Sequence, residues 1–82
     1  MKQYTIIMHR RGRETAFCGT LEELISKFSY TLEVGRSWEH ERGNKKINTH
    51  PATIRSLVSN LNNAENNAAA NGYSGVTYEL AQ

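Results

Sequence analysis

The sequence contains one cysteine, one proline and no long apolar run, and these shortages exclude several classes of protein. Cys18 has no second cysteine to pair with, so a disulfide within the chain is impossible. One cysteine and three scattered histidines lack the paired spacing of a structural zinc site, and we expect neither a metal nor a cofactor. No apolar segment approaches the roughly twenty residues of a membrane helix, and we see no signal peptide. We therefore expect a cytoplasmic protein with no membrane partner.

The chain is also short. Its 82 residues predict a single domain, residues 1–82. Such a domain buries only about two-thirds of the surface of its unfolded chain, which leaves little margin of stability. Small domains compensate with disulfides, metals or self-association, and only the last of these remains here. We expect a homo-oligomer, either a dimer or a higher assembly such as a hexamer.

Net charge is low, at +2, but it is unevenly distributed. Residues 1–18 carry four basic side chains and one acidic one, and residues 36–55 carry five basic and two acidic, which gives +3 for each segment. The other two segments, 19–35 and 56–82, carry −2 each. Two basic segments on a nearly neutral domain favour a small anionic ligand over a long nucleic acid.

The N-terminal segment predicts a β-hairpin. Residues 4–9 are rich in β-branched and aromatic side chains, and Tyr4, Ile6 and Met8 share one face at a period of two. The basic stretch at residues 10–13 contains Gly12, which favours a turn. Residues 14–18 then form the returning strand.

A first helix is predicted to begin after Thr20. Thr20 as N-cap with Glu23 three residues later forms a capping box, in which each side chain satisfies a backbone N–H of the other residue. Apolar residues recur at helical spacing: Leu21, Leu24, Ile25, Phe28 and Leu32. We expect this helix to stop at Val34–Gly35, with Gly35 in a left-handed conformation.

A polar segment without periodicity, residues 36–48, precedes a second helix, and loops of this length are commonly functional or disordered. The second helix is predicted to start at Thr49–Pro51 and to end at Asn71–Gly72. Its buried face consists of Ile54, Leu57, Val58, Leu61, Ala64 and Ala68. It also carries an asparagine-rich tract: Asn60, Asn62, Asn63, Asn66, Asn67 and Asn71. This tract is either a solvated helix face or the lining of a ligand or subunit interface.

Residues 76–80 alternate apolar and polar side chains and predict a last strand. The order ββααβ favours an α+β fold, a small antiparallel β-sheet with two helices on one face.

No catalytic pattern is complete, and we expect the protein not to be an enzyme. His40–Glu41 begins like a zinc-protease motif, but Asn44 stands where the second histidine is required. Ser37 follows a helix instead of a strand and lacks the glycine pattern of a nucleophile elbow. Cys18 has no histidine near it in the sequence that could activate it.

The best binding candidate is Arg36-Ser37-Trp38, which lies directly after the first helix. Trp38 is the only tryptophan and offers a flat face for stacking a base, while Arg36 offers paired donors to a phosphate. The alternative interpretation is that Trp38 closes one end of a small core. Similarly, Arg10, Arg11 and Arg13 either grip phosphates or keep a hairpin tip soluble.

Several blocks of the chain together resemble one family. They are Gly19–Ile25, Phe28–Trp38, Lys46–Asn48, Pro51, Thr53–Val58 and Tyr78–Ala81. This pattern resembles small phage and prophage proteins of the signal-sequestering anti-Thoeris type. Residues 39–43 look like an insertion relative to the loop of that family.

The resemblance implies a non-enzymatic sponge. Such proteins bind cyclic ADP-ribose isomers, and in some members cyclic oligonucleotides, so that a bacterial anti-phage defence effector is never activated. They form dimers and higher oligomers with ligand pockets near subunit interfaces. In this chain the ligand-binding residues would be Arg36, Trp38, Asn48 and Arg55, with Asn60 and Asn63 as amide donors.

Two alternatives from other classes remain. One is a small phage protein that inhibits a host enzyme by direct protein contact. The other is a small basic nucleic-acid-binding protein that uses Arg10, Arg11, Arg13, Lys45 and Lys46, and it predicts binding that weakens steeply with salt.

Overall fold

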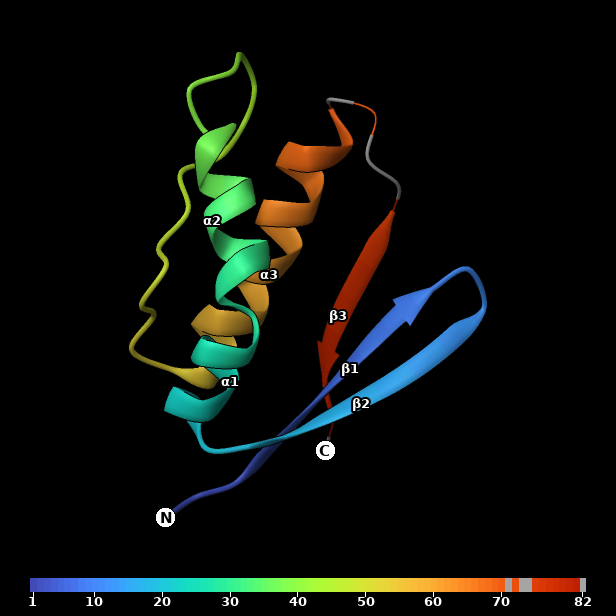
Figure 1. The fold of residues 1–82 in the computed structure, drawn as a ribbon, viewed down its shortest axis with the longest axis vertical. Helices are drawn as coiled ribbons and strands as arrows, with labels where there is room; N and C mark the ends of the chain where they lie inside the picture. Colours follow the sequence, from blue (N-terminus) through green and yellow to red (C-terminus); the bar gives the residue numbers. More distant parts are fainter. Residues whose placement is uncertain (71, 73–74, 82) are drawn as a thin grey trace.

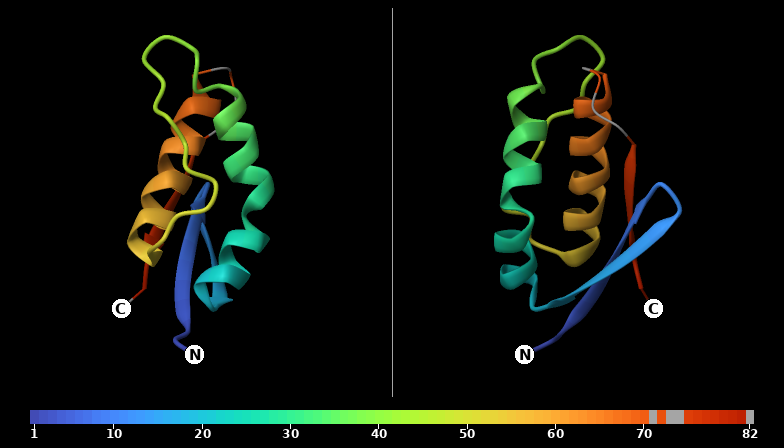
Figure 2. Two further views of the ribbon diagram at one scale, coloured as in Figure 1. Left: turned by 90° about the vertical axis from the view of Figure 1, so that its left-hand side faces the viewer. Right: turned by 45° about the vertical axis from the view of Figure 1, so that its right-hand side comes forward.

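The computed structural model describes residues 1–70, 72 and 75–81 and confirms the α+β fold. Three antiparallel strands, β1 (Tyr4–Arg10), β2 (Arg13–Gly19) and β3 (Val76–Leu80), form a sheet in the order β2-β1-β3. Three helices cover one face of this sheet (Figures 1 and 2): α1 (Leu21–Lys27), α2 (Ser29–Ser37) and α3 (Ile54–Ala69). In the described part of the chain, no helix is long and apolar enough to cross a membrane.

The sheet presents one face to the helices and leaves the other open. Along β1, the residues at period two from Tyr4 face the helices, and Ile6 is fully buried. His9 lies on the open face between two carboxylates. Its ring nitrogens are 3.4 Å from an oxygen of Glu14 on β2 and 3.3 Å from one of Glu79 on β3.

The outer edge of β3 is blocked at its middle residue, Tyr78, by a side chain of α3. The amide of Asn62 donates from Nδ2 to the carbonyl of Tyr78 (3.0 Å) and accepts at Oδ1 from its backbone N–H (2.8 Å). A second strand would use these same two backbone groups, so Asn62 blocks the edge at that point.

The predicted first helix is two helices. The chain turns at Phe28 (φ −98°, ψ 12°), although i→i−4 hydrogen bonds continue on both sides, from Phe28 N to Leu24 O and from Leu32 N to Phe28 O. Phe28 is buried, and its ring lies edge-to-face against those of Phe17 and Tyr78, with distances between ring centroids of 5.0 Å and 5.5 Å. On the two sides of this turn, α1 packs on β2 and α2 packs on α3.

The predicted role of Gly35 is wrong. Helix α2 continues to Ser37, and Gly35 lies inside it without a positive φ. A Cβ atom at this position would lie 2.2 Å from the Cβ of Ala64. Glycine is therefore required because α2 and α3 approach each other too closely for any side chain.

The second predicted helix begins later than expected, because Thr53 and not Thr49 is its N-cap. The backbone of Thr53 is extended (φ −133°, ψ 159°), and its hydroxyl accepts a hydrogen bond from the N–H of Ser56 at 3.1 Å. At the other end the helix stops at Ala69, and the predicted terminal residue Asn71 lies outside the described residues.

The long connection between α2 and α3 has a structural cause. The two helices run in the same direction (Figure 1), so the chain must return along the length of α3 before it can begin that helix. Consistent with this, Lys45 contacts Asn67 near the end of α3, and Asn48 contacts Asn60 closer to its start.

We predict that Gly35→Ala destabilises the fold by about 1–3 kcal/mol, because the added methyl group overlaps Ala64 and forces the helices apart. Gly75→Ala is the matched control, since a Cβ there meets nothing within 4 Å. Thermal or urea unfolding of both variants measures the difference. Equal stability of the two would contradict the close helix contact.

We predict that Thr20→Ala costs about 1 kcal/mol, the usual loss for an N-cap. The capping box is present, with Glu23 N donating to Thr20 Oγ1 (3.2 Å) and Thr20 N donating to Glu23 Oε1 (2.8 Å).

The backbone N–H of Thr20, followed by its hydroxyl, lowers the pKa of Glu23. A lowered folded pKa stabilises above the unfolded pKa, and this contribution is lost as the pH falls through the folded one. Glu23→Gln should therefore weaken the acid dependence of the melting temperature, and an unchanged acid profile would exclude this linkage.

Candidate functional site

The return segment between α2 and α3, residues 38–53, has no regular secondary structure and is fixed by side chains. Asn44 donates to the carbonyl of Trp38 (2.7 Å), and Glu39 accepts from the N–H of Ile47 (3.0 Å). Asn60 of α3 accepts from the N–H of Asn48 (2.8 Å). Ile47 itself is buried in the core. The segment is thus an ordered part of the fold.

Asn67 of α3 makes the most extensive of these connections. Its side chain is only 2% exposed. The amide donates to the carbonyls of Gly35 (3.1 Å) and Lys45 (2.8 Å), and its oxygen accepts from the N–H of Lys45 (3.0 Å). One side chain therefore joins the end of α2, the return segment and α3.

Three of the six predicted ligand residues share one hollow, which we call the polar hollow. Its volume is about 550 Å³, and Arg36, Asn48 and Asn60 line it together with Glu39, Lys46, Ile47 and Thr49. The three predicted residues among them each already have a hydrogen-bond or ion-pair partner within the chain. Arg36 pairs with Glu33 at 2.9 Å, Asn48 accepts from the N–H of His50 at 3.0 Å, and Asn60 donates to the carbonyl of Ser56 at 2.8 Å.

Trp38 lines a different hollow, which we call the aromatic pocket. Its volume is about 470 Å³, and its lining residues come from the end of β1, from β3 and from both long helices: Arg10, Tyr30, Thr31, Val34, Ser37, Trp38, Ala64, Glu65, Ala68 and Val76. Tyr30 is 81% exposed, so its ring is open to a ligand. Trp38 is half-buried. Both predicted roles of Trp38, in packing and in offering an aromatic face, are compatible with this position.

Glu65 supplies the carboxylate of the aromatic pocket. It accepts a hydrogen bond from the Tyr78 hydroxyl at 2.9 Å. Burial, and then the nearby charge of Glu65, raise the pKa of Tyr78 above its ordinary value, so the phenol stays protonated and keeps donating. The pocket therefore combines one cation, one carboxylate and two aromatic rings.

Sequence reasoning missed Arg10, Tyr30 and Glu65 as members of this pocket, although two signals were present. Arg10 continues the period-two face of β1 that points to the helices. Tyr30 precedes Trp38 by eight residues, so two steps of four place both rings on one side of α2.

Arg55 and Asn63, the other two predicted residues, line neither hollow. Arg55 is exposed in the first turn of α3. It lies at the opposite end of the helical layer from the end of α2, where Trp38 follows (Figure 1). Asn63 is half-buried on α3. The structure therefore does not bring the six candidates into one site.

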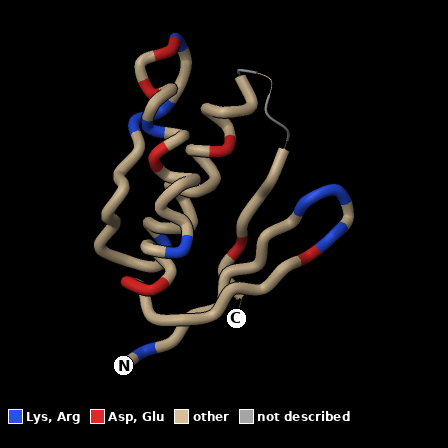
Figure 3. The backbone as a smooth tube through the Cα atoms, in the orientation of Figure 1, with Lys and Arg blue, Asp and Glu red and all other residues tan. Residues whose placement is uncertain are grey.

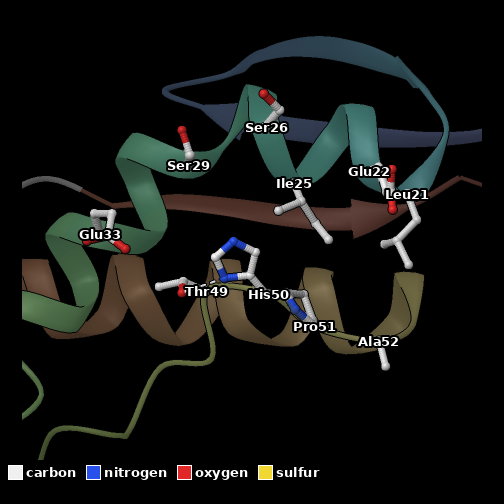
Figure 4. A pocket seen from close by; sticks show the side chains of 10 residues that line it. All are labelled: Leu21, Glu22, Ile25, Ser26, Ser29, Glu33, Thr49, His50, Pro51 and Ala52. Atoms are coloured by element: carbon white, nitrogen blue, oxygen red, sulfur yellow. Dashed lines mark hydrogen bonds between the residues drawn. The ribbon is translucent and has the colours of Figure 1, made fainter.

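A third hollow, of about 640 Å³, lies between the first two helices and the residues that precede α3 (Figure 4). Leu21, Ile25 and Pro51 give it apolar walls, and the ring of His50 lies between them. Its charged lining residues are Glu22 and Glu33, without a lysine or arginine. Carboxylates repel phosphate, so this hollow is a poor site for a nucleotide.

The chemistry available elsewhere is limited. Among residues 1–70, 72 and 75–81, no group of three His, Cys, Asp or Glu side chains is placed to hold a metal ion. Cys18 is exposed, with its sulfur 3.2 Å from the Thr5 hydroxyl. No protein family, curated protein or solved structure matches the chain. Function must therefore be inferred from the residues and their geometry.

We predict that Asn67→Ala destabilises the fold by about 3 kcal/mol, because it leaves the N–H and carbonyl of Lys45 without their partner and removes one of the two hydrogen bonds to the Gly35 carbonyl. The neighbouring Asn66→Ala is the matched control. Its side chain is exposed, and the change should stay within about 0.5 kcal/mol. Chemical unfolding of both variants gives the comparison, and equal midpoints would show that the Asn67 amide contributes nothing.

Proposed function

We propose that this protein is a non-enzymatic sponge that binds a small cyclic nucleotide in the aromatic pocket. The ligand is a cyclic ADP-ribose isomer or a cyclic oligonucleotide, and its sequestration blocks a bacterial anti-phage defence. The observation that carries the proposal is the convergence of Trp38, Tyr30 and Arg10 on one pocket of about 470 Å³. The link to phage and to immune signalling comes from the sequence resemblance described above.

Each part of a nucleotide has a complementary group in this pocket. A base can stack on Trp38 or on the exposed ring of Tyr30, and such stacking is worth about 1–3 kcal/mol per base. Arg10 can donate paired hydrogen bonds to a phosphate. Glu65 can accept from a ribose hydroxyl or an exocyclic amine.

The position of Arg10 also addresses an electrostatic requirement. The end of α2, where Trp38 follows, is the negative pole of a helix dipole and repels phosphate unless a cation offsets it. Arg10 approaches from β1, and Arg11 and Arg13 lie beside it at the hairpin tip (Figure 3). The anion would therefore be held from the sheet side and the base from the helix side.

A sponge acts by stoichiometric binding, so it needs a rigid pocket and no reactive group. The hydrogen bonds that the side-chain amides of Asn44 and Asn67 donate to backbone carbonyls hold the chain around Trp38 and supply that rigidity. As part of this proposal, the protein is phage- or prophage-encoded, acts in the cytoplasm of the infected cell and works as a homo-oligomer.

One observation favours a second candidate, a small nucleic-acid-binding protein. Three arginines, Arg10, Arg11 and Arg13, are concentrated at the hairpin tip. However, the other basic cluster, around Lys45 and Lys46, lies on the opposite side of the molecule (Figure 3). The two clusters thus form no single track, which leaves only a short contact for a nucleic acid.

We predict that the protein binds cyclic ADP-ribose isomers or cyclic tri-adenylate in isothermal titration. Trp38→Ala should weaken that binding by about 1–3 kcal/mol through loss of stacking. Arg10→Ala should weaken it by a similar amount through loss of a charge-assisted hydrogen bond. Each variant is first checked for a normal melting temperature.

Arg55→Ala and Arg36→Ala are the matched controls. Both remove one positive charge, the first outside the described hollows and the second in the polar hollow. Both should bind within about twofold of the unchanged protein, since surface charges away from the ligand contribute little. Loss of binding in Arg36→Ala alone would move the site to the polar hollow. If the unchanged protein binds no cyclic nucleotide but binds short RNA with a steep salt dependence, the second candidate replaces the first.

A further inference from the structure

We propose that the free edge of β2 is the surface on which a second copy of this chain binds, by antiparallel pairing of β2 with β2 of the other copy. This inference does not depend on what the aromatic pocket binds. It rests on the direction of backbone groups, on the unequal treatment of the two sheet edges and on the charges along β2.

The register of the sheet fixes which backbone groups of β2 point outward. Asn62 holds the backbone of Tyr78 on the side away from β1, and Ala81 N donates to Thr5 O across the β1–β3 pair at 2.9 Å. Backbone groups alternate sides along an antiparallel strand, so Thr5 points toward β3 and its partner Cys18 points away from β1. By the same alternation, the N–H and C=O groups of Glu14, Ala16 and Cys18 all face outward.

These outward groups have no partner within the described residues, whereas the other edge is blocked at Tyr78, the middle residue of β3. No described side chain or backbone group bonds to the backbone of β2 on that side. On β3, in contrast, Asn62 occupies both outward groups of Tyr78. The fold therefore interrupts one edge of its sheet at its middle residue and leaves the other able to pair along its length.

The residues of β2 suit close pairing. The strand has seven residues and no proline. Two of the residues whose backbone groups point outward, Ala16 and Cys18, have small side chains. Phe17, on the helix side, is half-buried and packs on Phe28. A strand added beside β2 would cover more of that ring, which adds apolar burial to the backbone hydrogen bonds.

Charge selects the orientation and the register. Parallel pairing in register would place Arg13 and Glu14 beside their own copies, which is unfavourable. Antiparallel pairing centred on Ala16 uses the whole strand, Arg13–Gly19. It places Glu14 opposite Cys18 and Arg13 opposite Gly19 of the other copy, so no like charges face each other. Ala16 then faces Ala16 of the second copy at the two-fold axis.

The test is a charge-complementation experiment at that axis. Ala16→Lys and Ala16→Glu are prepared separately, one of them isotope-labelled, and native mass spectrometry counts the dimers. The unchanged chain should show twice the 9.3 kDa chain mass at micromolar concentration. Each variant alone should dimerise about tenfold more weakly, because like charges meet across the axis. An equimolar mixture should contain the mixed dimer in about tenfold excess over random pairing.

Thr77→Lys and Thr77→Glu are the matched controls, since Thr77 is exposed on β3 and the same charges are introduced there. Their mixture should pair at random. A monomeric unchanged chain, or random pairing of the Ala16 variants, would overturn the proposal. So would a preference for mixed dimers in the Thr77 variants, because it would place the interface on β3.

Discussion

The parallel direction of α2 and α3 is the constraint on which the rest of the structure depends. Two adjacent parallel helices require a long return segment, and a segment without secondary structure has backbone groups that need partners. Helix α3 provides them from its asparagines. Asn60 and Asn67 bind the return segment, and Asn62 binds β3. The asparagine-rich tract thus supplies hydrogen-bond partners to backbone groups, as a neighbouring strand does in a sheet.

Local patterns in the sequence predicted the elements whose signals are local. The hairpin, the capping box at Thr20 and the strand at residues 76–80 follow from periodicity and turn chemistry, and the structure confirms them. The turn at Phe28, the position of Gly35 and the role of Asn67 were not predictable in this way. Each depends on contact with a residue far away in the sequence, and a single sequence does not show which distant residues come into contact.

The same distinction applies to the candidate site. Residue type identified Trp38 as a candidate for stacking a base, and it does line a pocket. Residue type also grouped Arg55 with Trp38, which the structure places at opposite ends of the helical layer. Arg10 enters the aromatic pocket from the hairpin, so the basic turn and the end of α2 contribute to one surface. Only the tertiary fold brings those two segments together.

The cap that Asn62 places on β3 has a consequence for assembly. A sheet with two open edges can add copies at both ends and grow into a fibre, whereas a sheet with one open edge has a valence of one. In the proposed dimer, pairing through β2 therefore ends after two copies, whatever the protein concentration. A larger assembly of such dimers must then be built through another surface.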